Sequence, residues 1–277
     1  LHQPHNIAGI RALSALMPDV PQVACFDTAF HMRQPELARR FALPRRLSEA
    51  GIKRYGFHGL SYEYIAGALP PHLGARAEGR VVVAHLGNGA SMCAMQRRSS
   101  VATTMGFSAL DGLMMGTRTG SLDPGALLYL MEVERLSLEE VGSTLYNQSG
   151  LLGVSGISAE PRVVVTHEND PGEAGERARI ALALYVRRIV REIGALTAVL
   201  GGLDLLVFTA GVGEHNAFVR ERVCRDLAFL GIKLDADANT INAPVISTTG
   251  SRVRVALEPT NEEWIAARCT QKLMTAG

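Results

Sequence analysis

The sequence predicts an α/β fold built on a mixed β-sheet, and three patterns support this prediction. Three apolar segments between Arg80 and Thr104 are joined by tight turns, which is typical of an antiparallel meander. Helical and strand-like segments then alternate along the chain, as in α/β proteins. A later segment, Asp204–Thr209, carries an apolar run that fits a strand buried on both faces of the sheet.

Hydrophobic periodicity places the individual elements. The longest helix is expected from Ala178 to Leu200, and the polar stretch Thr166–Arg177 before it resembles a linker. The expected strands are Val20–Phe26, Arg80–His85, Ser91–Met95, Val101–Thr104, Asp204–Thr209 and Arg252–Leu257. The other expected helices are Asn6–Leu16, Ser61–Ala68, Asp123–Glu134, Ser137–Leu145, Ala217–Leu227 and Asn261–Leu273.

Composition excludes several classes of protein. The 277 residues are 47% hydrophobic and 20% charged, as in an ordinary globular protein, and the net charge of +1 indicates no nucleic-acid partner. No apolar run is long enough to span a membrane, and no lysine follows a GxxxxG segment, so no P-loop is present. The four cysteines form no CxxC pair, which fits reduced thiols in the cytoplasm. The first residues, LHQPHNIAGI, resemble the middle of a protein, so we expect sequence upstream.

Two apolar strands end on glycine pairs. The segment VVVAHLGNGAS runs into Gly87 and Gly89, and DLLVFTAGVGEHN contains Gly211 and Gly213 before the helix expected from Ala217. Such bare backbone serves either a tight turn or the close approach of an anion, and a helix N-terminus favours the anion. Neither segment reads GxGxxG, so a dinucleotide site is disfavoured.

Four polar segments leave two interpretations open at this stage. Asp27 either caps a turn or is paired with another group or a metal, and His58, between two glycines, is either structural or part of a site. Arg118 lies in the glycine-bounded loop MGTRTGSLDPG, which suits a phosphate. In EPTNEEW, Thr260 and Glu263 form either a helix capping box or part of a metal-facing acidic cluster.

Seven segments together resemble the acetokinase family of short-chain acyl kinases. In order they are FDTAFH, RYGFHG, HLGNGAS, MGTRTGSLDPG, QSGLLG, FTAGVGE and PTNEE. The resemblance implies an actin-like ATPase fold, in which two ribonuclease-H-like domains close over a nucleotide. It implies that residues 31–263 form the second, nucleotide-binding domain, that residues 1–29 and 264–277 are remnants of the first, and that the protein is a homodimer.

The resemblance also implies an activity, the Mg²⁺-dependent conversion of ATP and acetate to ADP and acetyl phosphate. Arg118 and His58 would stabilise the transition state, Asp27 would be the catalytic acidic residue, and Glu262 would be a metal site. Because acetate is already ionised near neutrality, we expect Asp27 to position magnesium and its waters and not to act as a strong base. The implied nucleotide-binding residues are His85, Leu86, Gly87, Asn88, Gly89, Glu160, Pro161, Arg162, Gly211, Val212, Gly213, Glu214 and His215. The implied residues of the substrate pocket are His2, Phe57 and Ala109.

The chain departs from the family pattern at several positions. SAEPR replaces the usual Ser-Asp-x-Arg, His215 follows Glu214 where Asn is usual, Tyr62 ends HGLSY in place of His, and Ala109 replaces a common pocket proline. A roomier pocket at Ala109 makes a propionate or butyrate kinase the alternative. A non-catalytic nucleotide-binding module is a further alternative, against which Asp27, His58 and Arg118 argue. Because the family's first phosphate hairpin and an acyl-binding arginine are absent, we expect this chain alone to be poorly active.

Overall fold

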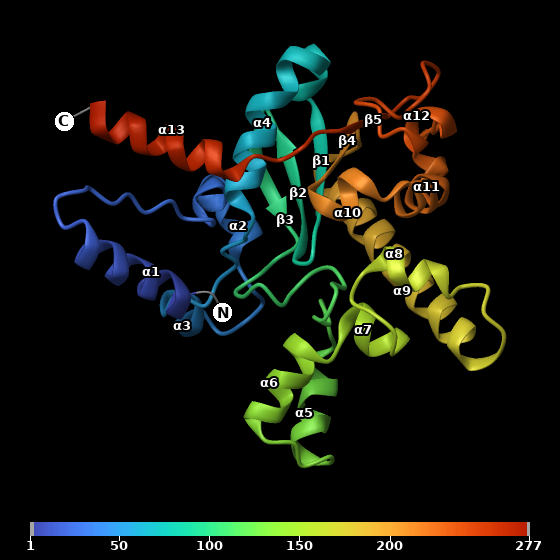
Figure 1. The fold of residues 1–277 in the computed structure, drawn as a ribbon, viewed down its shortest axis with the longest axis horizontal. Helices are drawn as coiled ribbons and strands as arrows, with labels where there is room; N and C mark the ends of the chain where they lie inside the picture. The colour runs from blue at the N-terminus through green and yellow to red at the C-terminus, as the bar shows by residue number, and fades with distance from the viewer. Residues whose placement is uncertain (1–2, 276–277) are drawn as a thin grey trace.

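A five-stranded mixed sheet forms the centre of the molecule (Figure 1). The computed structural model describes residues 3–275. The strands are β1 (Arg80–Leu86), β2 (Ala90–Gln96), β3 (Ser99–Thr103), β4 (Leu205–Thr209) and β5 (Arg254–Leu257), in the spatial order β3-β2-β1-β4-β5. The pairs β1–β2 and β2–β3 are antiparallel, whereas β4 and β5 extend the sheet in parallel from β1. The predicted meander and the predicted mixed sheet are confirmed.

Strands β1, β2 and β4 are largely apolar and buried, as expected where helices cover both faces of the sheet. On one face, Val82 and Ala84 of β1 and Phe208 of β4 pack against the long helix α9 (Gly172–Leu200). On the other face, alternate residues such as Val81 and Val83 pack against α4 (Gly59–Leu73). The carboxyl ends of β1 and β4 therefore open together at one edge of the sheet.

The remaining helices surround this core, and all seven predicted helices are present, with ends that differ by a few residues. They are α1 (Gln3–Leu16), α2 (Glu36–Arg39), α3 (Arg45–Glu49), α5 (Pro124–Glu132), α6 (Leu138–Asn147), α7 (Gly150–Ser155), α8 (Pro161–Thr166), α10 (Ala210–His215), α11 (Ala217–Asp226), α12 (Ala236–Thr240) and α13 (Glu262–Thr275). Single 3₁₀ turns are η1 (Ala29–Arg33), η2 (Gly74–Glu78) and η3 (Ala228–Leu230). Helix α6 begins with a full capping box between Ser137 and Glu140, which explains why the sequence located it well.

Two sequence predictions differ from the structure. The segment 20–26 is not a strand, because it pairs with no neighbour in the sheet; Val20 and Phe26 are 53% and 67% exposed. An apolar run becomes a strand only where a sheet edge is available to pair with its backbone. The stretch Thr166–Arg177, which resembles a linker in the sequence, is largely helical: Thr166 ends α8, and the residues from Gly172 onward belong to α9.

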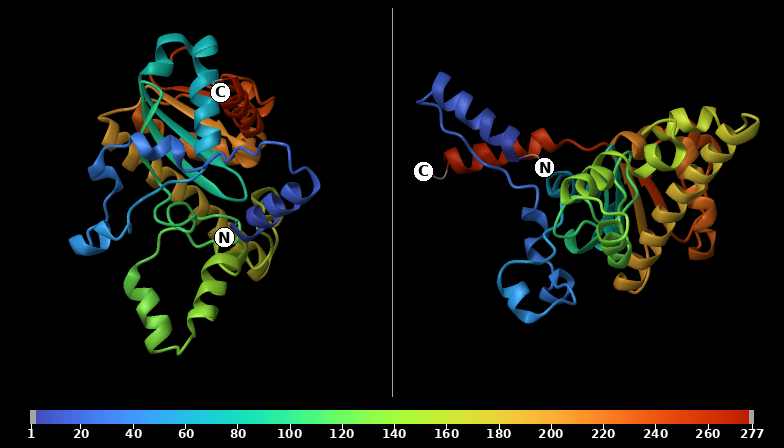
Figure 2. Two further views of the ribbon diagram at one scale, coloured as in Figure 1. Left: turned by 90° about the vertical axis from the view of Figure 1, so that its left-hand side faces the viewer. Right: turned by 90° about the horizontal axis from the view of Figure 1, so that it is seen from below.

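Helices α1 and α13 project away from the sheet on the same side of the molecule (Figure 2). The chain after α1 approaches α13, where Cys25 Sγ lies 4.0 Å from the Ala266 carbonyl oxygen. Several apolar side chains of α1 are exposed, among them Ile7, Ile10 and Leu13. Within residues 3–275, no helix combines the length and the apolar character that crossing a bilayer requires.

Candidate active site

The turn between β1 and β2 consists of Gly87, Asn88 and Gly89. Neither glycine has a positive φ, and the same holds for Gly211 and Gly213. An L-residue could therefore adopt the backbone of this turn, so conformational freedom does not require the glycines. What they provide is space next to the backbone, which favours close approach of a ligand over an ordinary tight turn.

His58 and Arg118 both point at Gly89. A Cβ atom built on Gly89 would lie 3.4 Å from His58 Nε2 and 3.4 Å from Arg118 Nη1. The sequence separates the three residues widely, and the fold brings an imidazole and a guanidinium to the same side of the glycine turn. Burial lowers the pKa of Arg118, and its Nη1 also donates to the Ala109 carbonyl oxygen at 3.1 Å. The guanidinium still carries its positive charge, because the ordinary pKa of arginine lies far above neutrality.

Asp27 lies at the N-terminus of α4, beside His58. Its Oδ2 accepts a hydrogen bond from the His58 backbone N–H at 2.6 Å, and its carbonyl oxygen accepts from Gly59 N at 2.7 Å. His58 has a φ of 56°, and Gly59 packs directly on the Asp27 carbonyl, where a Cβ would collide with it. Asp27 therefore caps a helix that begins over thirty residues later, so the capping and the catalytic interpretations of this residue are compatible.

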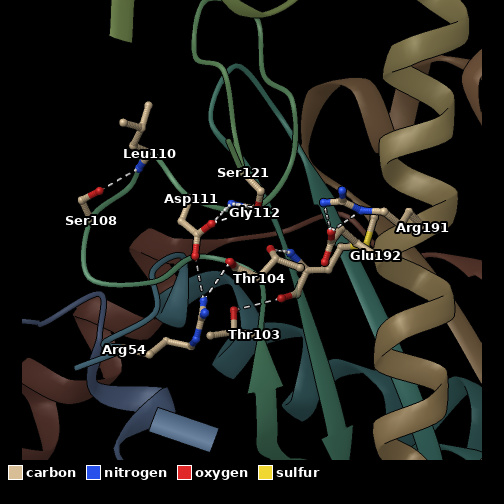
Figure 3. A network of polar contacts seen from close by, with 11 residues as sticks. Arg54, Thr103, Thr104, Ser108, Leu110, Asp111, Gly112, Ser121, Arg191 and Glu192 are labelled. Atoms are coloured by element: carbon tan, nitrogen blue, oxygen red, sulfur yellow. Dashed lines mark hydrogen bonds and ion pairs between the residues drawn. The ribbon is translucent and has the colours of Figure 1, made fainter. Parts of the chain in front are cut away.

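The loop that carries Arg118 is anchored by Asp111 (Figure 3). Asp111 Oδ1 accepts from the Gly112 N–H at 2.8 Å and from Ser121 Oγ at 2.9 Å, and its Oδ2 accepts from Arg54 Nη1 at 3.1 Å. Arg54 Nη1 also donates to the Thr104 carbonyl oxygen at 3.1 Å. The two ends of the loop are thus fixed to each other and to the sheet, which holds the Arg118 side chain in place.

His85 is the last residue but one of β1, close to the turn, and its ring stacks on that of His58. The two ring centroids are 4.2 Å apart and the ring planes differ by 14°. Burial, with the neighbouring His58 adding to it, lowers the pKa of His85 to about 3, so this imidazole is neutral at physiological pH. Its Nδ1 lies 2.9 Å from Ser61 Oγ, and His58 Nδ1 lies 2.8 Å from Ser91 Oγ.

A pocket of about 540 Å³ opens next to the glycine turn. It is formed by three parts of the chain that are distant in the sequence: the turn itself, the start of α8, and α10 together with the start of α11. Eight of the predicted nucleotide-binding residues line it, namely Gly87, Asn88, Glu160, Pro161, Arg162, Gly211, Val212 and His215. Val165, Asn216, Ala217 and Phe218 complete the lining. The volume suits a ligand of nucleotide size.

The other five predicted nucleotide-binding residues, His85, Leu86, Gly89, Gly213 and Glu214, do not line this pocket. Leu86 is fully buried in the core and can offer only its backbone, and Gly213 is a buried residue of α10 itself. Glu214 turns back on its own helix, where its Oε1 accepts from Ala210 N at 2.7 Å. Gly211 and Gly213 therefore lie inside the short helix α10 and not in a loop before α11, because this carboxylate closes the first turn of α10.

Comparisons with known proteins agree with this geometry. The model of the acetokinase family matches residues 1–268. An acetate kinase from Rhodopseudomonas palustris strain CGA009 is 56% identical over 280 residues, which cover 100% of this chain and 69% of the relative. The chain belongs to the acetokinase family.

Solved structures place this acetokinase family member within the actin-like ATPase fold. The crystal structure of Porphyromonas gingivalis acetate kinase superposes with a TM-score of 0.91 at 40% identity, covering 99% of this chain and 69% of that one. A propionate kinase from Francisella tularensis also gives a TM-score of 0.91, at 35% identity and with 97% and 68% coverage. The predicted fold class and the predicted family are confirmed, and as a member of this family the chain is a kinase.

The acidic residues of the site provide a donor set that fits a divalent metal. Glu262 is half-buried, and its pKa is raised by burial and by the nearby negative charge of Asp27. A cation between the two carboxylates would relieve this repulsion, and Mg²⁺ commonly binds through one or two carboxylates together with substrate phosphates and water. Within residues 3–275, no cluster of three or more His, Cys, Asp and Glu residues could hold a metal by itself.

Of the two interpretations of EPTNEEW, the capping box between Thr260 and Glu263 is not formed. Asn261 caps α13, since its Oδ1 accepts from Trp264 N at 2.9 Å. Thr260 instead donates its hydroxyl to Ser61 Oγ at 2.8 Å, and its N–H lies 3.3 Å from Glu214 Oε1. The family motif placed Glu262 at the site, whereas local spacing alone misplaced the cap by one residue.

Of the three predicted substrate-pocket residues, the structure locates Phe57 and Ala109. His2 lies outside the described residues. Phe57 and Ala109 are half-buried and pack against the core beside the site, and Ala109 contacts Arg118 through its carbonyl oxygen. Asp111, Ser61 and Ser91 were not predicted from the sequence, because their importance comes from contacts across the fold. Of the three, only Asp111 could have been suspected from the sequence, because it precedes a glycine in the loop that carries Arg118.

Proposed function

We propose that this protein catalyses the Mg²⁺-dependent, reversible transfer of a phosphoryl group from ATP to acetate. The convergence of His58 Nε2 and Arg118 Nη1 on Gly89 carries the proposal. Gly87 and Asn88 of the turn line the nucleotide-sized pocket, and the two hydrogen-bond donors lie at Gly89, the last residue of the same turn. The name of the relative from Rhodopseudomonas palustris, acetate kinase, supports acetate as the acceptor.

In this mechanism, an acetate oxygen attacks the γ-phosphorus of ATP, the bond to the bridging oxygen breaks, and ADP leaves with the bonding electrons. Acetate is already ionised near neutrality, so no general base is required. The enzyme's task is to align the reactants and to stabilise charge on the equatorial phosphoryl oxygens. Arg118 supplies a positive charge and His58 supplies an N–H donor on the Gly89 side of the turn, where those oxygens would lie.

Asp27 and Glu262 would hold the magnesium ion. When bound, Mg²⁺ would supply positive charge that neutralises the negative charge of the phosphate groups. The carboxylate of Asp27 also holds the backbone of His58, so one residue orients both the metal side and the donor side of the site. We assign Asp27 this positioning role and not that of a strong base.

The part of the pocket away from the glycine turn would hold the nucleoside. Arg162 Nε donates to Glu160 Oε2 at 2.7 Å at its exposed rim, and Val165 and Phe218 offer apolar contacts for a base. The Phe218 ring is held in place by a cation–π contact with Arg222, whose guanidinium lies 3.8 Å from the ring centroid. Arg222 in turn forms a salt bridge with Glu168. This arrangement supports the assignment of the segment 160–162 to the nucleoside, although its sequence departs from the family pattern.

We also propose the wider setting of the enzyme. Residues 31–263 would be the second ribonuclease-H-like domain, and residues 1–29 and 264–277 would belong to the first, as the projection of α1 and α13 from the sheet supports. We propose a homodimer in the cytoplasm that acts on ATP, ADP, acetate and acetyl phosphate. Sedimentation at micromolar concentration tests the dimer, and a monomer there would contradict it.

A hydroxamate assay on the gene product, expressed from its own start codon, tests the activity. We expect acetyl phosphate to form from ATP and acetate in the presence of Mg²⁺. Arg118→Lys should reduce kcat on the order of 10²–10³-fold, because an ammonium does not reproduce the guanidinium geometry. In Asp27→Asn, dependence on Mg²⁺ should weaken along with the rate; full retention of that dependence would contradict the role of Asp27. ATP binding without any transfer to a carboxylate would instead indicate a nucleotide-binding module.

Propionate is the second candidate acceptor. The similarity to the Francisella tularensis propionate kinase and the small side chain of Ala109 next to Arg118 favour it. The same assay with propionate in place of acetate decides between the two, through the ratio of the kcat/KM values. Butyrate serves as the longer homologue in that series.

A further inference from the structure

The two stacked histidines of the site present the same nitrogen atom to the glycine turn. His58 Nε2 lies 3.4 Å from the Cβ position of Gly89, and His85 Nε2 lies 3.7 Å from that of Gly87. In both rings the other nitrogen, Nδ1, points away from the turn and meets a serine hydroxyl, Ser91 for His58 and Ser61 for His85. The two serines therefore decide which nitrogen carries the proton when a ring is neutral.

Tyr62 sets the direction of the hydrogen bonds that lead to His58. Its side chain is fully buried, and its hydroxyl lies 2.5 Å from Ser91 Oγ. Among residues 3–275, Ser91 is the only hydrogen-bond partner of this hydroxyl. A buried phenol without an acceptor is costly, so Tyr62 donates to Ser91. The single hydroxyl proton of Ser91, itself fully buried, is then directed to His58 Nδ1, which acts as the acceptor.

Thr260 sets the direction of the hydrogen bonds that lead to His85 in the same way. Its hydroxyl donates to Ser61 Oγ at 2.8 Å, and Ser61 is fully buried. The Ser61 proton is thereby directed to His85 Nδ1, 2.9 Å away. His85 is neutral, so its one ring proton resides on Nε2, on the side of the glycine turn.

We propose that Tyr62 and Thr260 are positioning residues, which act through Ser91 and Ser61 to hold both imidazoles in the tautomer protonated at Nε2. The turn is then flanked by two N–H donors, ready to bind phosphoryl oxygens. In the opposite tautomer, an Nε2 lone pair would face those oxygens and repel them. The significance of the donors rests on the proposed phosphoryl transfer, whereas the tautomers are a property of the chain and can be measured without substrate.

The first test is ¹⁵N NMR of the 277-residue chain labelled at histidine, because the nitrogen shifts distinguish a protonated from an unprotonated ring nitrogen. His58→Gln and His85→Gln assign the signals. We expect both rings to carry the proton on Nε2. Tyr62→Phe should move His58 towards a mixture of tautomers and leave His85 unchanged, and Thr260→Val should do the reverse. If Tyr62→Phe does not fold, Ser91→Ala carries the same test, because it removes only the hydroxyl.

Tyr185→Phe is the matched control. Tyr185 is 3% exposed, it lies on α9 at the opposite face of the sheet, and its hydroxyl has no hydrogen-bond partner among residues 3–275. The same chemical change there should leave both tautomers unaltered. A wild-type His58 protonated on Nδ1, or a His58 signal that Tyr62→Phe does not change, would overturn the proposal.

The second test is kinetic and uses the hydroxamate assay on the gene product. Tyr62→Phe should lower kcat at least roughly tenfold with the KM for ATP nearly unchanged, since losing a whole donor of this kind costs on the order of 10²–10³ in kcat. Tyr185→Phe should retain the wild-type kcat. A shifted tautomer with wild-type kcat would overturn the catalytic part of the proposal. The expected tautomers in a wild type that forms no acetyl phosphate would count against the proposed function alone.

Discussion

Replacing Gly89 by alanine should abolish most of the activity and leave the fold intact. The backbone of Gly89 lies outside the positive-φ region, so alanine can adopt it. The added Cβ would meet its nearest neighbours, His58 Nε2 and Arg118 Nη1, at 3.4 Å, which is an ordinary contact. The free energy of unfolding should therefore change by less than about 1 kcal/mol.

The effect on catalysis should be far larger, because the new methyl group stands in the space that both donors face. Excluding a phosphoryl oxygen from at least one of them should cost on the order of 10²–10³ in kcat, or about 2.7–4 kcal/mol of transition-state stabilisation. The pocket for the nucleoside lies elsewhere, so the affinity for ADP should fall much less.

The assay combines hydroxamate formation with urea unfolding and with calorimetric titration of ADP. Gly142→Ala in α6 is the matched control: its Cβ would meet no atom within 4 Å, and it should raise the stability of its helix without changing kcat. A Gly89→Ala enzyme with kcat within fivefold of the wild type would refute the argument that this turn is bare in order to admit the phosphoryl group. Loss of the folded state would equally contradict it, since the structure predicts no clash.

Three further changes test separate parts of the structure. Ala109→Pro should narrow the acyl pocket and so lower the ratio of kcat/KM for propionate to kcat/KM for acetate roughly tenfold. The fold should tolerate the proline, because the Ala109 N–H that it removes has no hydrogen-bond partner within residues 3–275. An unchanged ratio would show that Ala109 does not line the acyl pocket. Hydrogen bonds from Arg80 lower the pKa of Asp204 below its ordinary value of 3.8, so this pair stabilises the fold above about pH 4 and loses its effect as the pH falls through the folded-state value. The Tm difference between wild type and Asp204→Asn should accordingly shrink in acid, and a difference that grows there would have the wrong sign. Ser137→Ala should destabilise the protein by about 1 kcal/mol in urea unfolding, because it removes the capping box formed with Glu140, and activity should be retained.

Local sequence patterns were sufficient for the sheet and for most helices. Strands β1, β2 and β4 are buried on both faces, so their apolar runs stand out, and Ser137 with Glu140 marks the start of α6. The segment 20–26 has an equally apolar sequence but no sheet edge to pair with. Its failure as a strand follows from long-range pairing, which a local pattern does not contain.

The composition of the candidate site was also predictable, whereas its connections were not. The ordered motifs identified Asp27, His58 and Arg118, and the fold brings His58 and Arg118 to Gly89. The sequence could not decide whether the glycine turn was an ordinary tight turn, because that depends on φ angles and on neighbours such as Arg118. The contact between Asp111 and Arg54 was likewise not predictable from the sequence, since it joins residues 57 positions apart.

The sequence by itself determined the type of fold, the family and the residue types available for phosphoryl transfer, because hydrophobic period and motif order are properties of short stretches of chain. Only the tertiary structure decided how those groups act together: Asp27 capping the helix that follows His58, hydroxyl groups orienting His58 and His85, and a turn left bare to make room. Hydrogen-bond direction and close approach depend on distances between segments remote in the sequence, and those distances exist only once the chain is packed.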